Sequence, residues 1–153
     1  MIELDVASAI PVGITIDPME RIVAVLNASE LVLPEGRINL VFTDDLEIQK
    51  LNLEYAGHDY ATDVLSFSYI EAGGEAIDGT LGDMIISVET AARQASKAKT
   101  DLGTEVALLA LHGTLHILGY DHTEPGARVE LDTLQQQLMM AAGLPYRNFE
   151  WIS

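Results

Sequence analysis

Three of the four histidines in this 153-residue chain lie within one short stretch, at His112, His116 and His122. Residues four apart on a helix share one face, so His112 and His116 can hold one ion together. Gly119 can adopt the left-handed conformation that ends a helix, after which the chain can reverse and bring His122 to the same ion. Three imidazoles leave a fourth tetrahedral position for water, as in catalytic zinc sites. The spacing therefore predicts one zinc ion per chain and a hydrolytic reaction.

Two histidines on an apolar helix could instead be core residues whose ring nitrogens are satisfied by hydrogen bonds. The third histidine and the turn-forming glycine favour the metal. The spacing also matches the metzincin pattern of zinc proteases, in which a glutamate general base follows the first histidine. Gly113 occupies that position here, which argues against proteolysis. Other carboxylates near in sequence could act as the base, and the sequence does not choose among them: Asp63, Asp121 and Glu124.

The composition limits the chemistry further. The chain has no cysteine, so a zinc site must use histidine or carboxylate ligands. Its net charge of −16, from 8 basic and 24 acidic residues, opposes non-specific binding to nucleic acid, although a local basic cluster can still act. There is no run of apolar residues long enough to span a membrane and no secretory signal pattern. We therefore expect a soluble, cytoplasmic protein that does not contact membranes.

The elements that must position the histidines alternate between strands and helices. Segments typical of strands are 1–9, 37–43, 63–69 and 81–87. Segments with the start and stop signals of helices are 21–31, 44–54, 87–99, 101–118 and 124–142. We expect Asp17 to cap the first helix and the apolar helix 101–118 to be buried. The series predicts one α/β or α+β domain over residues 1–153, in which a small mixed sheet of about four strands packs with about five helices.

The run from Leu111 to His122, LHGTLHILGYDH, resembles the signature HGxLHLxGYDH of the YbeY family of ribosomal RNA maturation endoribonucleases. The resemblance extends upstream, in the family's order, through residues 51–55, 62–67 and 81–87. It implies an α/β fold with a metzincin-like zinc helix, zinc held by the three histidines, and metal-dependent cleavage of single-stranded RNA. It also implies a role in 3′-end maturation of small-subunit ribosomal RNA and in ribosome quality control. The expected partners are then ribosomal RNA or the small ribosomal subunit, and not DNA.

The basic residues of the chain offer few contacts for such a substrate. Arg93, Lys97 and Lys99 form the densest basic cluster and are the candidate RNA-binding residues, with a solvated helix face as the alternative. The family usually has arginine after the tyrosine at Tyr55, whereas this chain has Ala56. A charge able to clamp a phosphate is therefore missing. His58 could supply a charge when protonated, or be a plain exposed loop residue.

These observations rank three functions. A zinc-dependent endoribonuclease comes first because the resemblance covers most of the chain. A metallopeptidase-like zinc hydrolase comes second, since Gly113 removes the expected base. A non-catalytic, ribosome-associated zinc protein comes third. The histidines alone predict a catalytic zinc, but Ala56 and the acidic composition favour this non-catalytic role.

Overall fold

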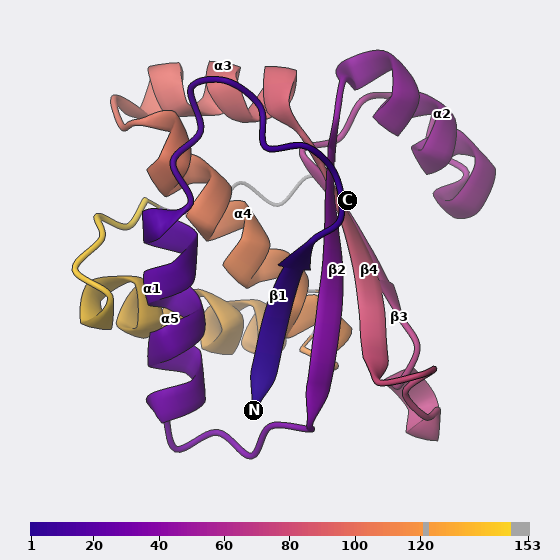
Figure 1. The fold of residues 1–153 in the computed structure, drawn as a ribbon, viewed down its shortest axis with the longest axis vertical. Helices are drawn as coiled ribbons and strands as arrows, with labels where there is room; N and C mark the ends of the chain where they lie inside the picture. The colour runs from indigo at the N-terminus through magenta and orange to yellow at the C-terminus, as the bar shows by residue number, and fades with distance from the viewer. Residues whose placement is uncertain (121–122, 148–153) are drawn as a thin grey trace.

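The computed structural model describes residues 1–120 and 123–147. The chain alternates between strands and helices at first and then runs through three successive helices (Figure 1). The elements are, in order, β1 (Ile2–Val6), α1 (Asp17–Ala28), β2 (Gly36–Thr43), α2 (Asp45–Ala56), β3 (Val64–Ser68), β4 (Thr80–Ser87), α3 (Val88–Ala98), α4 (Leu102–Ile117) and α5 (Pro125–Ala141). A short 3-10 turn, Glu71–Gly73, lies between β3 and β4.

Within this part of the chain, four strands form one mixed sheet in the order β1-β2-β4-β3. Strands β1, β2 and β4 run parallel, and β3 pairs antiparallel with β4 at the edge of the sheet. Figure 1 shows α1, α4 and α5 on one side of the sheet and α2 on the other. The predicted fold, a small mixed sheet packed with helices, is confirmed.

Helix α4, which carries His112 and His116, lies at the centre of the hydrophobic core. All its residues from Gly103 to Leu115 are buried, and it packs against α1, α3, β3 and β4. The sheet contributes four fully buried apolar side chains to the same core: Ile38, Leu40, Met84 and Ile86. Each such side chain stabilises the fold by about 1.5–3 kcal/mol relative to an exposed one. The histidines are therefore carried by a rigid, well-packed element.

The starts of three helices follow from local side-chain chemistry. Asp44, Ser87 and Asp101 precede α2, α3 and α4. The side-chain oxygen of each accepts the backbone N–H of the third residue of its helix, at 2.8, 3.3 and 2.7 Å. Such caps each contribute about 1 kcal/mol. No helix in the described part of the chain is long and apolar enough to cross a membrane.

The prediction for the first helix was wrong at both ends. Asp17 lies inside α1 and the cap position falls to Ile16, whose side chain makes no capping bond. The Asp17 carboxylate instead accepts from Arg21 Nε one turn later, at 3.1 Å. The helix stops at Ala28 because the Ser29 backbone is extended and its hydroxyl donates to the Leu26 carbonyl at 2.6 Å.

Strand β3 turns its polar side toward α4. Ser68 Oγ donates to the Ile117 carbonyl at 2.7 Å, and Ser66 lies against Gly113. The alternate residues point to the other face, where Phe67 meets the ring of Tyr55 from α2. Small hydroxyl side chains suit this place because α4 approaches the edge of the sheet closely.

Candidate metal centre

Helix α4 ends one residue after His116, and the backbone of the next residues closes it. Gly119 has a φ of +102° and its N–H donates to the His116 carbonyl at 3.0 Å. The Tyr120 N–H donates to the Leu115 carbonyl, also at 3.0 Å. Together these two bonds make a Schellman motif, in which a glycine with positive φ ends the helix. The chain therefore turns directly after the histidine helix, as the sequence predicts.

His112 and His116 lie side by side on α4, with ring centroids 6.5 Å apart. The His112 side chain is only 6% exposed, whereas His116 is partly exposed and lies in the last turn. The carbonyl end of a helix carries partial negative charge, which favours a cation there. The structure thus brings together two of the three predicted ligands.

The third predicted ligand, His122, lies outside the described residues. Within residues 1–120 and 123–147, no three histidine, aspartate or glutamate side chains gather as a metal site. A complete site would therefore need His122 or another ligand in addition to His112 and His116.

The ring of His112 is held by Gln135 of α5. Nδ1 of His112 lies 2.7 Å from Oε1 of Gln135, whose side chain is fully buried. An amide oxygen can only accept, so this contact is a hydrogen bond when Nδ1 carries the proton, and in that form Nε2 keeps the lone pair that a metal needs. Metal-binding histidines almost always donate their second ring nitrogen in this way. His112, supported in this way, and His116 are therefore suited to be two of the ligands of a zinc ion.

Gly113 has a structural reason to be glycine. A Cβ at this position would lie 2.9 Å from Ser66 Oγ and 2.9 Å from the sulfur of Met84, which is fully buried. Helix α4 therefore approaches β3 and β4 closely here, and any side chain at position 113 would have to displace the Ser66 hydroxyl and the end of the Met84 side chain. With glycine at this position, the chain lacks the protease general base.

Of the three candidate bases, Asp63 has the most distinctive surroundings. It immediately precedes β3, and its carboxylate accepts from the Val64 N–H at 2.7 Å and from Gln94 Nε2 at 3.2 Å. Burial raises the pKa of the Asp63 carboxyl, and these hydrogen bonds oppose the rise in part. Glu124 is exposed before α5, and Asp121 lies outside the described residues. Among the described candidates, Asp63 has the environment nearest to that of a general acid or base.

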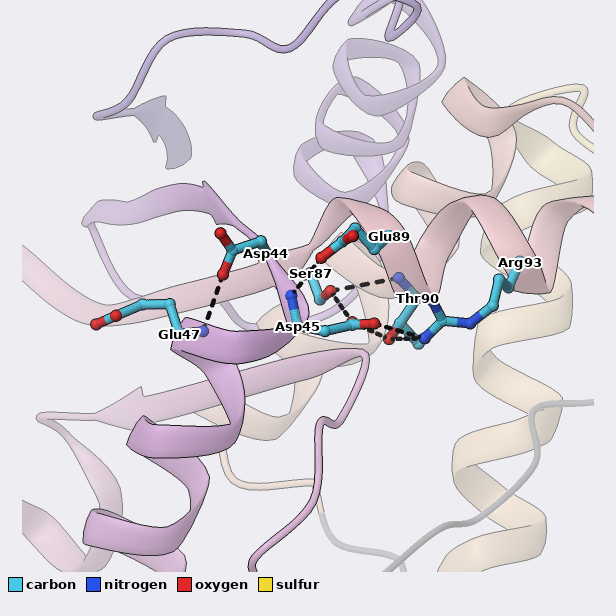
Figure 2. Close-up of polar contacts among 7 residues, drawn as sticks. All are labelled: Asp44, Asp45, Glu47, Ser87, Glu89, Thr90 and Arg93. Carbon is cyan, nitrogen blue, oxygen red and sulfur yellow. Dashed lines mark hydrogen bonds and ion pairs between the residues drawn. The ribbon is translucent and has the colours of Figure 1, made fainter.

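Arg93, one of the predicted RNA contacts, is paired with an acidic residue. Its Nη2 donates to Asp45 Oδ2 at 2.8 Å, and the other carboxylate oxygen accepts from the hydroxyls of Ser87 and Thr90, both at 2.6 Å (Figure 2). Burial raises the pKa of the Asp45 carboxyl, but these hydrogen bonds and the charge of Arg93 lower it more, and the net shift is downward. Arg93 therefore ties α3 to the start of α2, and its charge is partly compensated.

The other two basic residues lie at the end of the same helix. Lys97 is in the last turn of α3 and is exposed. Lys99 is exposed just beyond it, with a φ of +57°. Their contact with RNA stays a prediction.

Comparison with known proteins assigns the family. The family model described as endoribonuclease YbeY matches residues 14–143. A protein named endoribonuclease YbeY from Moorella thermoacetica is 39% identical over 136 residues, covering 82% of this chain and 85% of the relative. Another from Syntrophotalea carbinolica is 42% identical over 120 residues, covering 75% and 79%. The chain belongs to the YbeY endoribonuclease family. The prediction of a YbeY-family enzyme is thereby confirmed.

The YbeY match spans the elements from α1 to α5, so it includes the whole histidine helix. The fold also resembles a solved structure, the solution structure of a protein from Thermotoga maritima. The two share a TM-score of 0.61 and 20% identity, over 93% of this chain and 89% of that one. At this identity the similarity concerns the fold alone.

The YbeY resemblance predicts an arginine where this chain has Ala56. Ala56 is the exposed last residue of α2. Its neighbour Tyr55 packs edge-on against Phe67 of β3, with ring centroids 5.4 Å apart. Ser66, next to Phe67, lies against Gly113 on the histidine helix. The end of α2 and the histidine helix therefore flank the same edge strand, one on each face.

The sequence analysis does not identify Gln135, although a signal is present. Leu131, Leu138 and Met139 form the buried face of α5, and Gln135 falls on this face at helical spacing. A polar side chain in a row of core positions needs a buried partner. A glutamine among the buried positions of this helix therefore indicates a buried polar partner, and the buried histidines of α4 are the candidates.

Proposed function

We propose that this chain is a zinc-dependent endoribonuclease that cleaves single-stranded RNA. Its biological substrate would be ribosomal RNA or the small ribosomal subunit, in 3′-end maturation and ribosome quality control in the cytoplasm. Family membership supports cleavage of RNA. The observation that carries the metal is the pair His112 and His116 on one buried helix, with His112 Nδ1 bonded to Gln135.

One zinc ion per chain would be held by His112, His116 and His122. When bound, zinc supplies Lewis-acid activation of an oxygen atom at neutral pH. The chain's own residues then have separate tasks. The three histidines would bind the zinc ion. Gln135 orients the ring of His112, and the close packing at Gly113 holds α4 against the edge strand β3.

The metallopeptidase alternative is disfavoured by the glycine at position 113. Zinc proteases with this histidine spacing use the next residue as general base. Here the next residue is Gly113, which has no side chain to act as the base. We therefore rank RNA above protein as the substrate.

The proposal is tested on the purified protein by measuring bound zinc and then the cleavage of single-stranded RNA, duplex RNA and casein. We expect about one zinc per chain, as the three-histidine site predicts, and cleavage of single-stranded RNA that a chelator stops and added zinc restores. Casein cleavage without RNA cleavage would overturn the proposal in favour of a peptidase. Zinc without any cleavage would favour a non-catalytic ribosome-associated zinc protein.

Replacing Ala56 with arginine is expected to raise RNA cleavage. A guanidinium at the end of α2 can form a charge-assisted hydrogen bond with a phosphate, which stabilises a complex by about 1.5–3 kcal/mol when fully formed. Because position 56 is exposed, we expect the lower end of this range, roughly a ten-fold rise in kcat/KM. The measurement is kcat/KM on a single-stranded oligoribonucleotide.

Ala56→Gln is the matched control, because glutamine adds a long side chain at the same exposed position without the charge. An equal rise in both variants, or no rise in Ala56→Arg with the fold intact by circular dichroism, would reject the missing charge as an explanation.

A further inference from the structure

Two buried side chains from different helices meet beside the candidate metal centre. His112 of α4 and Gln135 of α5 are 6% and 0% exposed, and their contact at 2.7 Å is a buried side-chain hydrogen bond. A buried amide or imidazole that lacks a hydrogen-bond partner destabilises the fold, so the contact is favoured over separation of the two side chains. The bond therefore couples the orientation of the His112 ring to the position of α5.

The amide of Gln135 has only one favourable orientation. Its Nε2 donates to the Tyr146 hydroxyl at 3.4 Å, and that hydroxyl donates to Asp132 Oδ1 at 3.0 Å. A hydroxyl has one proton, so with the proton directed at Asp132 its lone pair faces Gln135. A flipped amide would bring its oxygen toward that lone pair and its NH2 group toward Nδ1 of His112. The chain of donors therefore runs in one direction, from His112 through Gln135 and Tyr146 to Asp132.

The segment that supplies Tyr146 is itself fastened to the core. Leu144 is 5% exposed, and Arg147 forms an ion pair with Glu105 of α4, with Nε 3.0 Å from Oε1. The Glu105 side chain is 1% exposed, so this pair is largely shielded from water. Residues 144–147 are thus held on the same helix that carries the histidines.

We propose that Gln135, oriented by Tyr146, is a positioning residue that keeps His112 in the Nδ1–H form with Nε2 presented to zinc. The inference rests on the proposed metal centre and deepens it. An outer partner of this kind typically changes metal affinity by about 10- to 100-fold. A purely structural role for Gln135 would change stability without changing the tautomer or the zinc affinity of the folded protein.

The first test uses the metal-free protein and needs no activity. Long-range ¹H–¹⁵N spectra of ¹⁵N-histidine-labelled protein, after removal of metal, report which ring nitrogen carries the proton. We expect the Nδ1–H form for His112 in the wild type and in Gln135→Glu, which keeps an acceptor oxygen, and loss of that form in Gln135→Leu. An Nε2–H ring in the wild type would overturn the proposal.

The second test measures zinc affinity by competition with a chelator of known strength. We expect Gln135→Leu to bind zinc about 10- to 100-fold more weakly than the wild type. Gln135→Glu keeps the acceptor for Nδ1 but loses the N–H that bonds Tyr146, so it should be weakened less than Gln135→Leu. Gln136→Leu is the matched control, because Gln136 is its exposed neighbour on the same helix. Unchanged affinity in folded Gln135→Leu would overturn the proposal, and Tyr146→Phe gives a milder variant if that protein fails to fold.

The two proposals fail in different ways. A wild-type protein that shows the Nδ1–H form but binds no zinc would overturn the metal centre, and with it the metal role of Gln135. A wild-type protein that binds zinc and cleaves RNA, with no change in Gln135→Leu, would overturn the positioning role alone.

Discussion

His116→Ala is expected to abolish tight zinc binding and to lower RNA cleavage by more than about 100-fold. Loss of a residue that only supports a metal ligand already costs roughly 10- to 100-fold, and loss of a ligand should cost more. His112 and His116 are neighbours on one helix face, so removing His116 leaves α4 with a single zinc ligand. Alanine is the best helix former and His116 is partly exposed, so α4 should persist. Zinc content by mass spectrometry and kcat/KM on single-stranded RNA are the measurements.

His58→Ala is the matched control for zinc content. His58 is an exposed loop residue whose ring lies 5.6 Å from that of Tyr60, and it is not a predicted ligand. Its replacement should leave the zinc content unchanged. Full zinc retention by His116→Ala, or equal loss in both variants, would contradict the assignment of the ligands.

Gly82→Ala is expected to destabilise the fold by about 3 kcal/mol or more, the upper range for overpacking. Gly82 lies in β4, paired on one side with Ile38 and on the other with Ser68, so its backbone has no room to move. A Cβ at this position would overlap the Phe67 carbonyl oxygen and lie 3.0 Å from Ile117 Cγ2. Urea unfolding should show a lower midpoint with a similar slope.

The same glycine-to-alanine change at Gly126 serves as the control. Gly126 lies in the first turn of α5, and a Cβ there would meet nothing within 4 Å. Alanine favours the helix over glycine by about 0.5–1 kcal/mol, so Gly126→Ala should be neutral or slightly stabilising. Equal unfolding midpoints for the two variants would show that the close approach at Gly82 does not limit stability.

The Gly82→Ala variant should also bind zinc less tightly, because the added Cβ lies against Ile117, which directly follows His116.

The elements of this fold are largely visible in the sequence because their signals are local. The histidine helix, predicted from 101 to 118, is found at Leu102–Ile117, with Asp101 at its cap and Gly119 just after its end. Caps, hydrophobic periodicity and glycine turns act over a few residues. The first helix shows the limit of such signals, since Asp17 is a good cap by type but pairs with Arg21 instead.

The sequence by itself determined the family, the helix that carries His112 and His116, and the turn that follows, because each depends on residue type and short spacing. Tertiary structure alone decided that Gln135 from α5 meets His112, that Arg93 is paired with Asp45, and that Ser66 and Met84 lie close against Gly113. Each of these contacts joins residues more than 20 positions apart. These contacts depend on how closely the helices pack against each other and against the sheet. A pattern of residue types over a few positions does not determine that distance.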